Sequence, residues 1–347
     1  MSRVVFATDL HLTEGQEGVR AFVDDLTEIV ALSPDLLVLG GDICLWEAGA
    51  GDLLQGLLRD LPMPCLGLMG NHDTDRSRPP DELDHDFVTR FDARNGCIEL
   101  GDAHVVGLNT CRMQPGFDDW RNVCGRVDAD DLAWLERTLA GLDRSRPLLL
   151  FVHIPLATTY PERRGADAAT TDVWRVADAE PVLQQLADWP APVIVGQGHL
   201  HENEHLHVGR VHFVSVGSVC GRWWQQGPET RCTDESPRGW LVVDVVGGEI
   251  DLEYRAARRP AQWRGEIVDG EKGLLLNLFF GDPTELVEVS IAEEWVPLAP
   301  PDPVPVYDRF VSTHHWALPA GWSGDRLSLR SRTRDRPWEC EVVRRRG

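Results

Sequence analysis

Residues 3–11 read RVVFATDLH, and residues 36–42 read LLVLGGD. In both stretches a short apolar run of strand length ends close to a carboxylate. Continuous apolar runs of this length are typical of strands in a sheet that is buried on both faces. The two stretches therefore predict buried strands, with Asp9 and Asp42 just beyond their carboxyl ends.

The same alternation of strand and helix continues to about residue 190. Further apolar runs predict strands at 65–69, 105–108, 148–152, 193–195, 211–216, 240–246 and 250–254. Apolar residues at helical spacing predict helices at about 19–30, 53–61, 132–142 and 182–189. Alternating strands and helices predict a layered α/β sandwich.

From Arg255 onward the composition changes to proline, tryptophan and short alternating runs. These runs predict strands at 274–280, 286–291, 309–311, 327–330 and 339–343. We therefore predict two domains, an α/β domain at 1–257 and a small all-β, sandwich-like domain at 258–347.

Five segments that follow predicted strands carry residues of metal-binding type. They are Asp9-Leu10-His11, Gly41-Asp42, Gly70-Asn71-His72-Asp73, His153 and Gly198-His199-Leu200-His201. Each one alone is common in turns, loops or cores, but loops beyond the carboxyl ends of parallel strands meet at one edge of a sheet. Carboxylates, an amide oxygen and imidazoles, without a thiolate, suit divalent Mn, Fe or Zn. Together the segments predict a metal site.

This set of motifs, in this order, resembles that of the calcineurin-like metallophosphoesterases. A weaker similarity, at 216–218, 221–224 and 236–240, is to members with a β-rich C-terminal domain. The resemblance implies two divalent ions, whose identity among Mn, Fe and Zn stays open. It implies that one ion is held by Asp9, His11 and His201, that the second is held by Asn71, His153 and His199, and that Asp42 bridges both.

The resemblance also implies roles beside the metals. His72 would donate a proton to the leaving oxygen or stabilise the phosphoryl oxygens, and the alternative is that it only orients Asn71. Asn71 and His72 would also contact the substrate. Independently of the resemblance, Arg222 follows the last predicted strand near the ligands and could supply a guanidinium for phosphate. Asp73 either orients His72 or caps the next turn.

One departure narrows the class of relatives. Leu45 stands where many protein phosphatases have aspartate and where purple acid phosphatases have tyrosine. The pattern instead resembles the bacterial cyclic-nucleotide phosphodiesterases, although relatives of other specificity share it.

Other residues are candidates for packing as much as for substrate contact. The segment 158–177 contains Tyr160, Arg163, Arg164 and Trp174, and Arg222 is followed by Trp223 and Trp224. We expect His205, His207 and His212 to be exposed or strand-paired histidines, not ligands. We expect His314-His315-Trp316 to pack within the C-terminal domain.

The chain is strongly acidic. It has 56 Asp and Glu against 34 Lys and Arg, a net charge of −22, and Lys272 is its only lysine. Such a surface repels polyanions at long range, which argues against long nucleic acids and anionic membranes as partners. Two dications outweigh the charges of Asp9 and Asp42, so the site itself favours a small anionic substrate.

We therefore predict an enzyme, a dinuclear-metal hydrolase acting on a small phosphoester. A phosphodiester, cyclic-nucleotide-like or another small diester, is favoured, with attack by a hydroxide that bridges the metals. Alternatives on the same site are a phosphomonoesterase and a nuclease. A non-enzymatic interaction module is disfavoured because no ligand position is lost.

Location and assembly are less constrained by the sequence. It shows no signal-peptide pattern and no apolar run of membrane-spanning length. Its eight cysteines are scattered, without the spacing of a disulfide framework. These features predict a cytoplasmic protein with reduced thiols and no membrane partner, and a homo-oligomer stays open.

Overall fold

The structure is a computed structural model of the whole chain. It describes residues 1–12, 16–44, 50–74, 78–79, 82–113, 123–222, 229–307, 310–331 and 337–345. Leu45, Trp223 and Trp224, which the sequence analysis singled out, lie outside these ranges.

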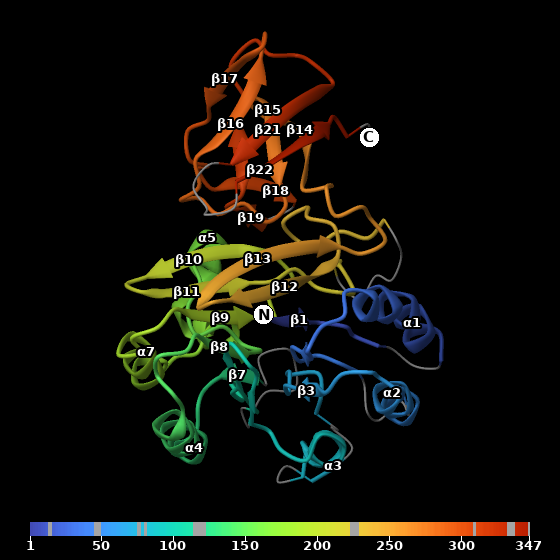
Figure 1. Cartoon of the computed structure of the whole chain (residues 1–347), viewed down its shortest axis with the longest axis vertical. Helices are drawn as coiled ribbons and strands as arrows, with labels where there is room; N and C mark the ends of the chain where they lie inside the picture. The colour runs from blue at the N-terminus through green and yellow to red at the C-terminus, as the bar shows by residue number, and fades with distance from the viewer. Residues whose placement is uncertain are drawn as a thin grey trace.

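Two mixed β-sheets form the centre of the N-terminal part (Figure 1). The first has the order β13-β12-β1-β2-β3 and consists of β1 (Ser2–Ala7), β2 (Leu36–Leu39), β3 (Cys65–Gly67), β12 (Gly239–Val246) and β13 (Glu249–Ala256). The second has the order β10-β11-β9-β8-β5-β4 and consists of β4 (Gly96–Glu99), β5 (His104–Gly107), β8 (Leu148–Val152), β9 (Val193–Gln197), β10 (Glu204–Val208) and β11 (Val211–Ser215). In both sheets the central pairs are parallel, which brings the carboxyl ends of neighbouring strands to the same edge.

The two sheets pack face to face. Phe6 of β1 stacks on Phe151 of β8 with ring centroids 4.8 Å apart. Val4 and Phe6 belong to the core between the sheets, whereas the alternate residues Val5 and Ala7 belong to the core under the helices. Strand β1 is therefore buried on both faces, as its apolar run predicts.

Helices cover the outer faces of the two sheets (Figure 1). They are α1 (Gln16–Ala31), α2 (Ala50–Arg59), α3 (His85–Phe91), α4 (Ala129–Gly141), α6 (Thr171–Trp174) and α7 (Glu180–Ala187). The short helix α5 (Tyr160–Arg163) lies instead near the C-terminal part, where Tyr160 packs with Leu200 and Phe310, and a 3-10 turn follows at Ala168–Thr170. A short hairpin, β6 (Cys111–Met113) and β7 (Val123–Gly125), precedes α4. Helices α1 and α2 pack together, as do α4 and α7.

The C-terminal part is built from strands alone in the residues described. One sheet contains β14 (Gly265–Gly270), β15 (Gly273–Leu278) and β20 (His315–Ala317). A second contains β16 (Val287–Ile291), β17 (Glu294–Pro297), β21 (Arg326–Ser331) and β22 (Trp338–Val343), and a hairpin is formed by β18 (Val304–Tyr307) and β19 (Phe310–Ser312). Ile267 and Leu276 of the first sheet share one core with Val289 and Leu329 of the second, so the two sheets form a sandwich.

The predicted α/β body with a strand-rich C-terminal part is confirmed. Strand β10 was not predicted, because its sequence EHLHV places histidines where an apolar alternation would be expected. Strand β13 ends at Ala256 and β14 begins at Gly265, and the domain boundary at 257/258 stays a prediction.

Two further observations bear on the chain as a whole. All eight cysteines are free thiols, five of them buried. Among the described residues, no helix is both long enough and apolar enough to cross a membrane.

Candidate metal centre

The seven predicted ligands lie in loops that follow strands of both sheets. Asp9 and His11 follow β1, Asp42 follows β2, Asn71 follows β3, His153 follows β8, and His199 and His201 follow β9. All of them except His199, which is half-buried, are at most 9% exposed. Residues that are up to 192 positions apart in the chain, Asp9 and His201, therefore converge on one buried polar cluster.

Asp42 lies at the centre of this cluster. Its Oδ2 is 3.4 Å from Nε2 of His11, and its Oδ1 is 3.4 Å from Nε2 of His153. The two carboxylate oxygens thus face two different groups of side chains, which is the arrangement that a carboxylate shared between two ions requires.

The first group contains Asp9, His11 and His201. Nε2 of His201 is 3.3 Å from Oδ1 of Asp9 and 3.2 Å from Nε2 of His11. The ligand atoms of Asp9, His11 and Asp42 all lie within 4.8 Å of one another.

The second group contains Asn71, His153 and His199. Oδ1 of Asn71 is 3.1 Å from Nε2 of His153. The ligand atoms of Asp42, His153 and His199 lie within 4.8 Å of one another, so this group also meets at Asp42.

Backbone carbonyls fix three of the imidazole rings. Nδ1–H of His153 donates to Gly40 O, Nδ1–H of His201 donates to Gly221 O, and Nε2–H of His199 donates to Val173 O, each at 2.8 Å. A ring that donates from one nitrogen keeps the lone pair of the other for a metal. The other ring nitrogen, Nε2 in His153 and His201 and Nδ1 in His199, is therefore free of these backbone bonds and can bind a metal.

The backbone is held in uncommon conformations at these loops. Asp9, His11, Asp42, His199 and His201 all have positive φ, between 44° and 72°. Left-handed backbone is rare for residues other than glycine and clusters at functional sites.

Two of the glycines in the motifs are required by close approach. Gly41 has a φ of +93°, and a Cβ there would lie 2.4 Å from Nδ1 of His153. A Cβ on Gly70 would lie 2.1 Å from the backbone nitrogen of Asp42. Any side chain at either position would push the metal-binding loops apart.

The charges and protonation of the cluster fit divalent ions. Oδ1 of Asp9 is buried and accepts no hydrogen bond within the described part of the chain, whereas Oδ2 accepts from Thr8 Oγ1 and from the N–H of His199. Burial lowers the pKa of His199 to about 4, so its ring is the neutral form that binds metals. Burial also disfavours charge on His153, but the carboxylate of Asp42 outweighs it and raises the pKa of His153 to about 9. A cation at this position would replace that proton.

Comparison with known proteins agrees with this geometry. A sequence model described as calcineurin-like phosphoesterase matches residues 2–203, more than half of the chain. The chain belongs to this family. A second model, the C terminal of calcineurin-like phosphoesterase, matches residues 214–321. The protein is therefore a hydrolase of phosphoester bonds, from a family with a divalent metal centre.

Two relatives with named activities share most of their length with this phosphoesterase. It is 24% identical over 218 residues to a probable cyclic nucleotide phosphodiesterase of Synechococcus sp. strain WH7803, covering 58% of the chain and 76% of the relative. It is 22% identical over 242 residues to a 3′,5′-cyclic-nucleotide phosphodiesterase of Nostoc sp. strain PCC 7120, covering 66% of the chain and 83% of the relative. A solved dimetal phosphatase from Danio rerio has the same fold, with a TM-score of 0.51, 13% identity and coverage of 74% of this chain and 96% of that one.

Two residues beside the ligands have roles that the sequence analysis did not identify. Oδ1 of Asp73 accepts from the N–H groups of Ile43 and Cys44, and Oδ2 accepts from that of Gly70. Asp73 therefore joins the loops after β2 and β3, instead of orienting His72 or capping the next turn. The thiol of Cys220 lies 3.9 Å from Nδ1 of His201. In the sequence, the one sign that Cys220 lies near the ligands is that it follows a predicted strand, at 211–216.

The predicted substrate contacts differ in their surroundings. The N–H of His72 donates to Oδ1 of Asp42 at 2.7 Å, and its half-buried ring meets that of His11 edge to face, with centroids 5.1 Å apart. The guanidinium of Arg222 pairs with the carboxylate of Glu235. The role of each in binding substrate stays a prediction.

The segment at 158–177 lies beside the centre. The ring of Trp174 is 5.9 Å from that of His199, centroid to centroid. Arg164 lies over the rings of Trp174 and Tyr160, and Arg163 pairs with Glu202. Arg164 is therefore engaged in packing on aromatic rings, and Arg163 in an ion pair.

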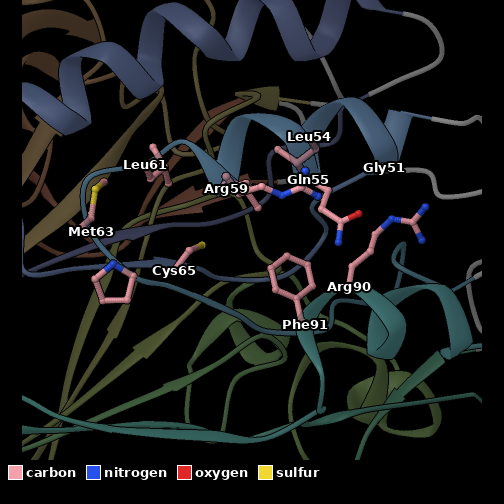
Figure 2. Close-up of a pocket in the computed structure, with 11 residues that line it drawn as sticks. Gly51, Leu54, Gln55, Arg59, Leu61, Met63, Cys65, Arg90 and Phe91 are labelled. Carbon is pink, nitrogen blue, oxygen red and sulfur yellow. The ribbon is translucent and has the colours of Figure 1, made fainter.

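A pocket of about 390 Å³ lies away from these ligands, between α2, β3 and α3 (Figure 2). Figure 2 shows apolar side chains such as Leu54, Met63 and Phe91 together with Arg59 and Arg90. None of the seven predicted ligands lines it. The chemistry of the phosphoesterase is therefore expected at the strand-end loops and not in this pocket.

Proposed function

We propose that this phosphoesterase hydrolyses small phosphodiesters of the cyclic-nucleotide class. The position of Asp42 carries the proposal, because its two oxygens face two separate groups of ligands. The activities named for the Synechococcus and Nostoc relatives support the substrate class. We propose that the ions are Mn, Fe or Zn and that their ligands are Asp9, His11, Asp42, Asn71, His153, His199 and His201.

Two divalent ions bound here would supply an activated water and neutralise charge on the phosphate oxygens. During hydrolysis the oxygen of water forms a bond to phosphorus, the bond from phosphorus to the leaving oxygen breaks, and the leaving oxygen takes a proton. His72 is placed beside His11 without belonging to either ligand group, so it is the residue that would donate this proton. Asn71 would orient the phosphate as well as holding a metal.

The charge of the molecule favours a small substrate. The net charge of −22 repels long polyanions, whereas two dications leave the site itself positive. A cyclic nucleotide is small enough to be governed by the local charge. A phosphomonoester shares this property, and therefore the experiment has to separate the two.

The test is a substrate panel on the purified chain reconstituted with Mn²⁺. We expect turnover of bis-p-nitrophenyl phosphate and of 2′,3′- or 3′,5′-cyclic nucleotides to exceed that of p-nitrophenyl phosphate and single-stranded DNA. Asp42→Asn should lower kcat by about 10³-fold or more, because a central charge of the site is lost. Asp60→Asn, at an exposed aspartate, is the matched control and should leave kcat unchanged.

Each outcome distinguishes one function. No hydrolysis of either nitrophenyl ester would overturn the proposal, faster turnover of the monoester would indicate a phosphomonoesterase, and preference for DNA would indicate a nuclease. Metal analysis of the chain as purified, before reconstitution, identifies the ions. A cytoplasmic location and a homo-oligomer stay predictions, to be checked by cell fractionation and by light scattering.

A further inference from the structure

A second cluster of metal-binding side chains lies outside the catalytic centre. His205 on β10, His212 on β11 and Asp282 in the loop after β15 have ligand atoms within 4.8 Å of one another. His207 on β10 adjoins this group, with Nε2 2.8 Å from Oδ2 of Asp282. From the sequence, the three histidines are predicted to be exposed or strand-paired. The structure shows the pairing but adds the carboxylate, which comes from the C-terminal part of the chain.

The hairpin places all three imidazoles on one face. His207 lies directly opposite His212 in the β10–β11 pair, and His205 is two residues from His207 on the same strand. Side chains two apart on a strand point to the same side, so the three rings gather there. The rings of His207 and His212 stack with centroids 4.0 Å apart, and those of His205 and His212 are 5.1 Å apart.

Asp282 is oriented toward these rings by its own loop. Its Oδ1 accepts from the N–H and the Oγ1 of Thr284, at 2.9 and 2.8 Å. Its Oδ2 is thereby turned to the histidines, 2.8 Å from Nε2 of His207 and 3.9 Å from both Nδ1 of His205 and Nε2 of His212. A carboxylate positioned by a second hydrogen-bonding partner is typical of metal sites.

The distances at Asp282 suit a small tetrahedral ion. Nδ1 of His205 and Nε2 of His212 are 2.9 Å apart, and the separations of Oδ2 of Asp282 from the three rings run from 2.8 to 3.9 Å. A tetrahedral Zn²⁺ site with nitrogen and oxygen ligands has ligand atoms about 3.3–3.5 Å apart. The observed values lie on both sides of this range, and small movements of side chains would equalise them.

Burial and access also fit a bound ion. The side chains of His205 and Asp282 are 1% and 7% exposed, and those of His212 and His207 are 16% and 40% exposed. The cluster is therefore buried at His205 and Asp282 and open to solvent at His207. Three imidazoles and one carboxylate form a donor set that suits Zn²⁺ better than it suits Mg²⁺ or Ca²⁺.

We propose that His205, His207, His212 and Asp282 form a separate mononuclear Zn²⁺ site. It would tie the β10–β11 hairpin of the α/β body to the loop after β15 in the C-terminal sandwich, and so hold the two parts together. The site shares no ligand with the catalytic centre. Its occupancy therefore does not depend on the proposed function.

The test counts zinc on the full chain after equilibration with ZnCl₂ and removal of the unbound metal. We expect wild type to retain one more Zn²⁺ per chain than either His212→Gln or Asp282→Asn, as measured by atomic emission. His85→Gln, at an exposed histidine on α3, is the matched control and should retain the same zinc as wild type. His207→Gln changes a partly exposed side chain and provides a variant that is expected to fold normally.

A second measurement separates zinc binding from any structural role of these residues. Added ZnCl₂ should raise the Tm of wild type by several degrees more than that of His207→Gln or Asp282→Asn. Equal zinc content in wild type and in all three cluster variants would overturn the proposal, as would equal zinc-induced shifts in Tm. If the zinc count falls by one while no phosphoester is hydrolysed, the site is supported and only the proposed catalytic function fails.

Discussion

At the scale of single residues, His72 differs from the histidines that surround it. The rings of three predicted ligands, His153, His199 and His201, donate hydrogen bonds to backbone carbonyls. The N–H of His72, in contrast, donates to Asp42, so the backbone of this residue is fixed while its half-buried ring faces that of His11. This placement allows the ring to meet a substrate without holding a metal.

We predict that His72→Ala retains the metals and loses turnover. Loss of a general acid costs about 10²–10⁴-fold in rate. The cost should be largest for an alkoxide leaving group and smallest for p-nitrophenolate, which leaves without a proton. Parallel measurements of kcat on the two kinds of ester, with metal content, check this. Equal losses on both esters would show that His72 is not the proton donor.

At the scale of elements, the centre depends on how the loops after different strands are held together. The N–H groups of Ile43, Cys44 and Gly70 all donate to Asp73, which is completely buried. The loop after β2 carries Asp42, and the loop after β3 carries Asn71. Asp73 therefore sets the distance between Asp42 and Asn71, the proposed bridging and terminal ligands.

We predict that Asp73→Asn weakens metal binding more than it changes catalysis by the loaded enzyme. An amide would present N–H donors to backbone N–H groups, which cannot accept them. Loss of such an outer partner lowers metal affinity by about 10–100-fold. Titration with Mn²⁺ should give a raised midpoint with nearly unchanged kcat at saturation. An unchanged midpoint of the Mn²⁺ titration would contradict the inference that Asp73 holds the two ligand loops together.

At the scale of the whole molecule, buried polar contacts join the C-terminal sandwich to the α/β body. Asp234, in the loop before β12, accepts from Nε2 of His314 at 2.9 Å and from the N–H of Asn203 at 2.6 Å. Phe310 of β19 packs with Tyr160 and Leu200, next to the loops that carry the ligands. The sandwich therefore contacts the segment that borders the catalytic centre.

We predict that Asp234→Asn destabilises the protein at neutral pH by about 1–3 kcal/mol, the usual cost of breaking a buried polar contact. Burial alone would raise the pKa of Asp234, but His314 and the surrounding N–H donors hold it below its ordinary value. A lowered folded-state pKa stabilises above the unfolded value, near 3.8, and this contribution is lost as the pH falls through the folded-state value.

Urea denaturation at several pH values checks this. The difference in midpoint between wild type and Asp234→Asn should be constant from pH 7 to about 5 and should shrink below about pH 4. Asp60→Asn should show no such difference. If the difference in urea midpoint between wild type and Asp234→Asn stayed the same down to pH 3, the stabilising role of the ionised Asp234 would be contradicted.

The strands and the identities of the candidate ligands could be predicted because their signals are local. Apolar runs such as 36–39 and 148–152 mark buried strands, and the motifs directly follow them. Strand β10 and the short helices α5 and α6 could not be predicted in this way, because they have little apolar periodicity.

By itself the sequence determined which residues are available for metal chemistry and in which order they occur. Only the tertiary structure decided which of them meet, because hydrogen bonds between distant segments set their positions. In the tertiary structure Arg222 pairs with Glu235, and Asp282 contacts three histidines that lie 70–77 residues earlier in the chain. Motifs carry the chemistry of single side chains, whereas a site also requires distances, and these arise from how the sheets and loops pack.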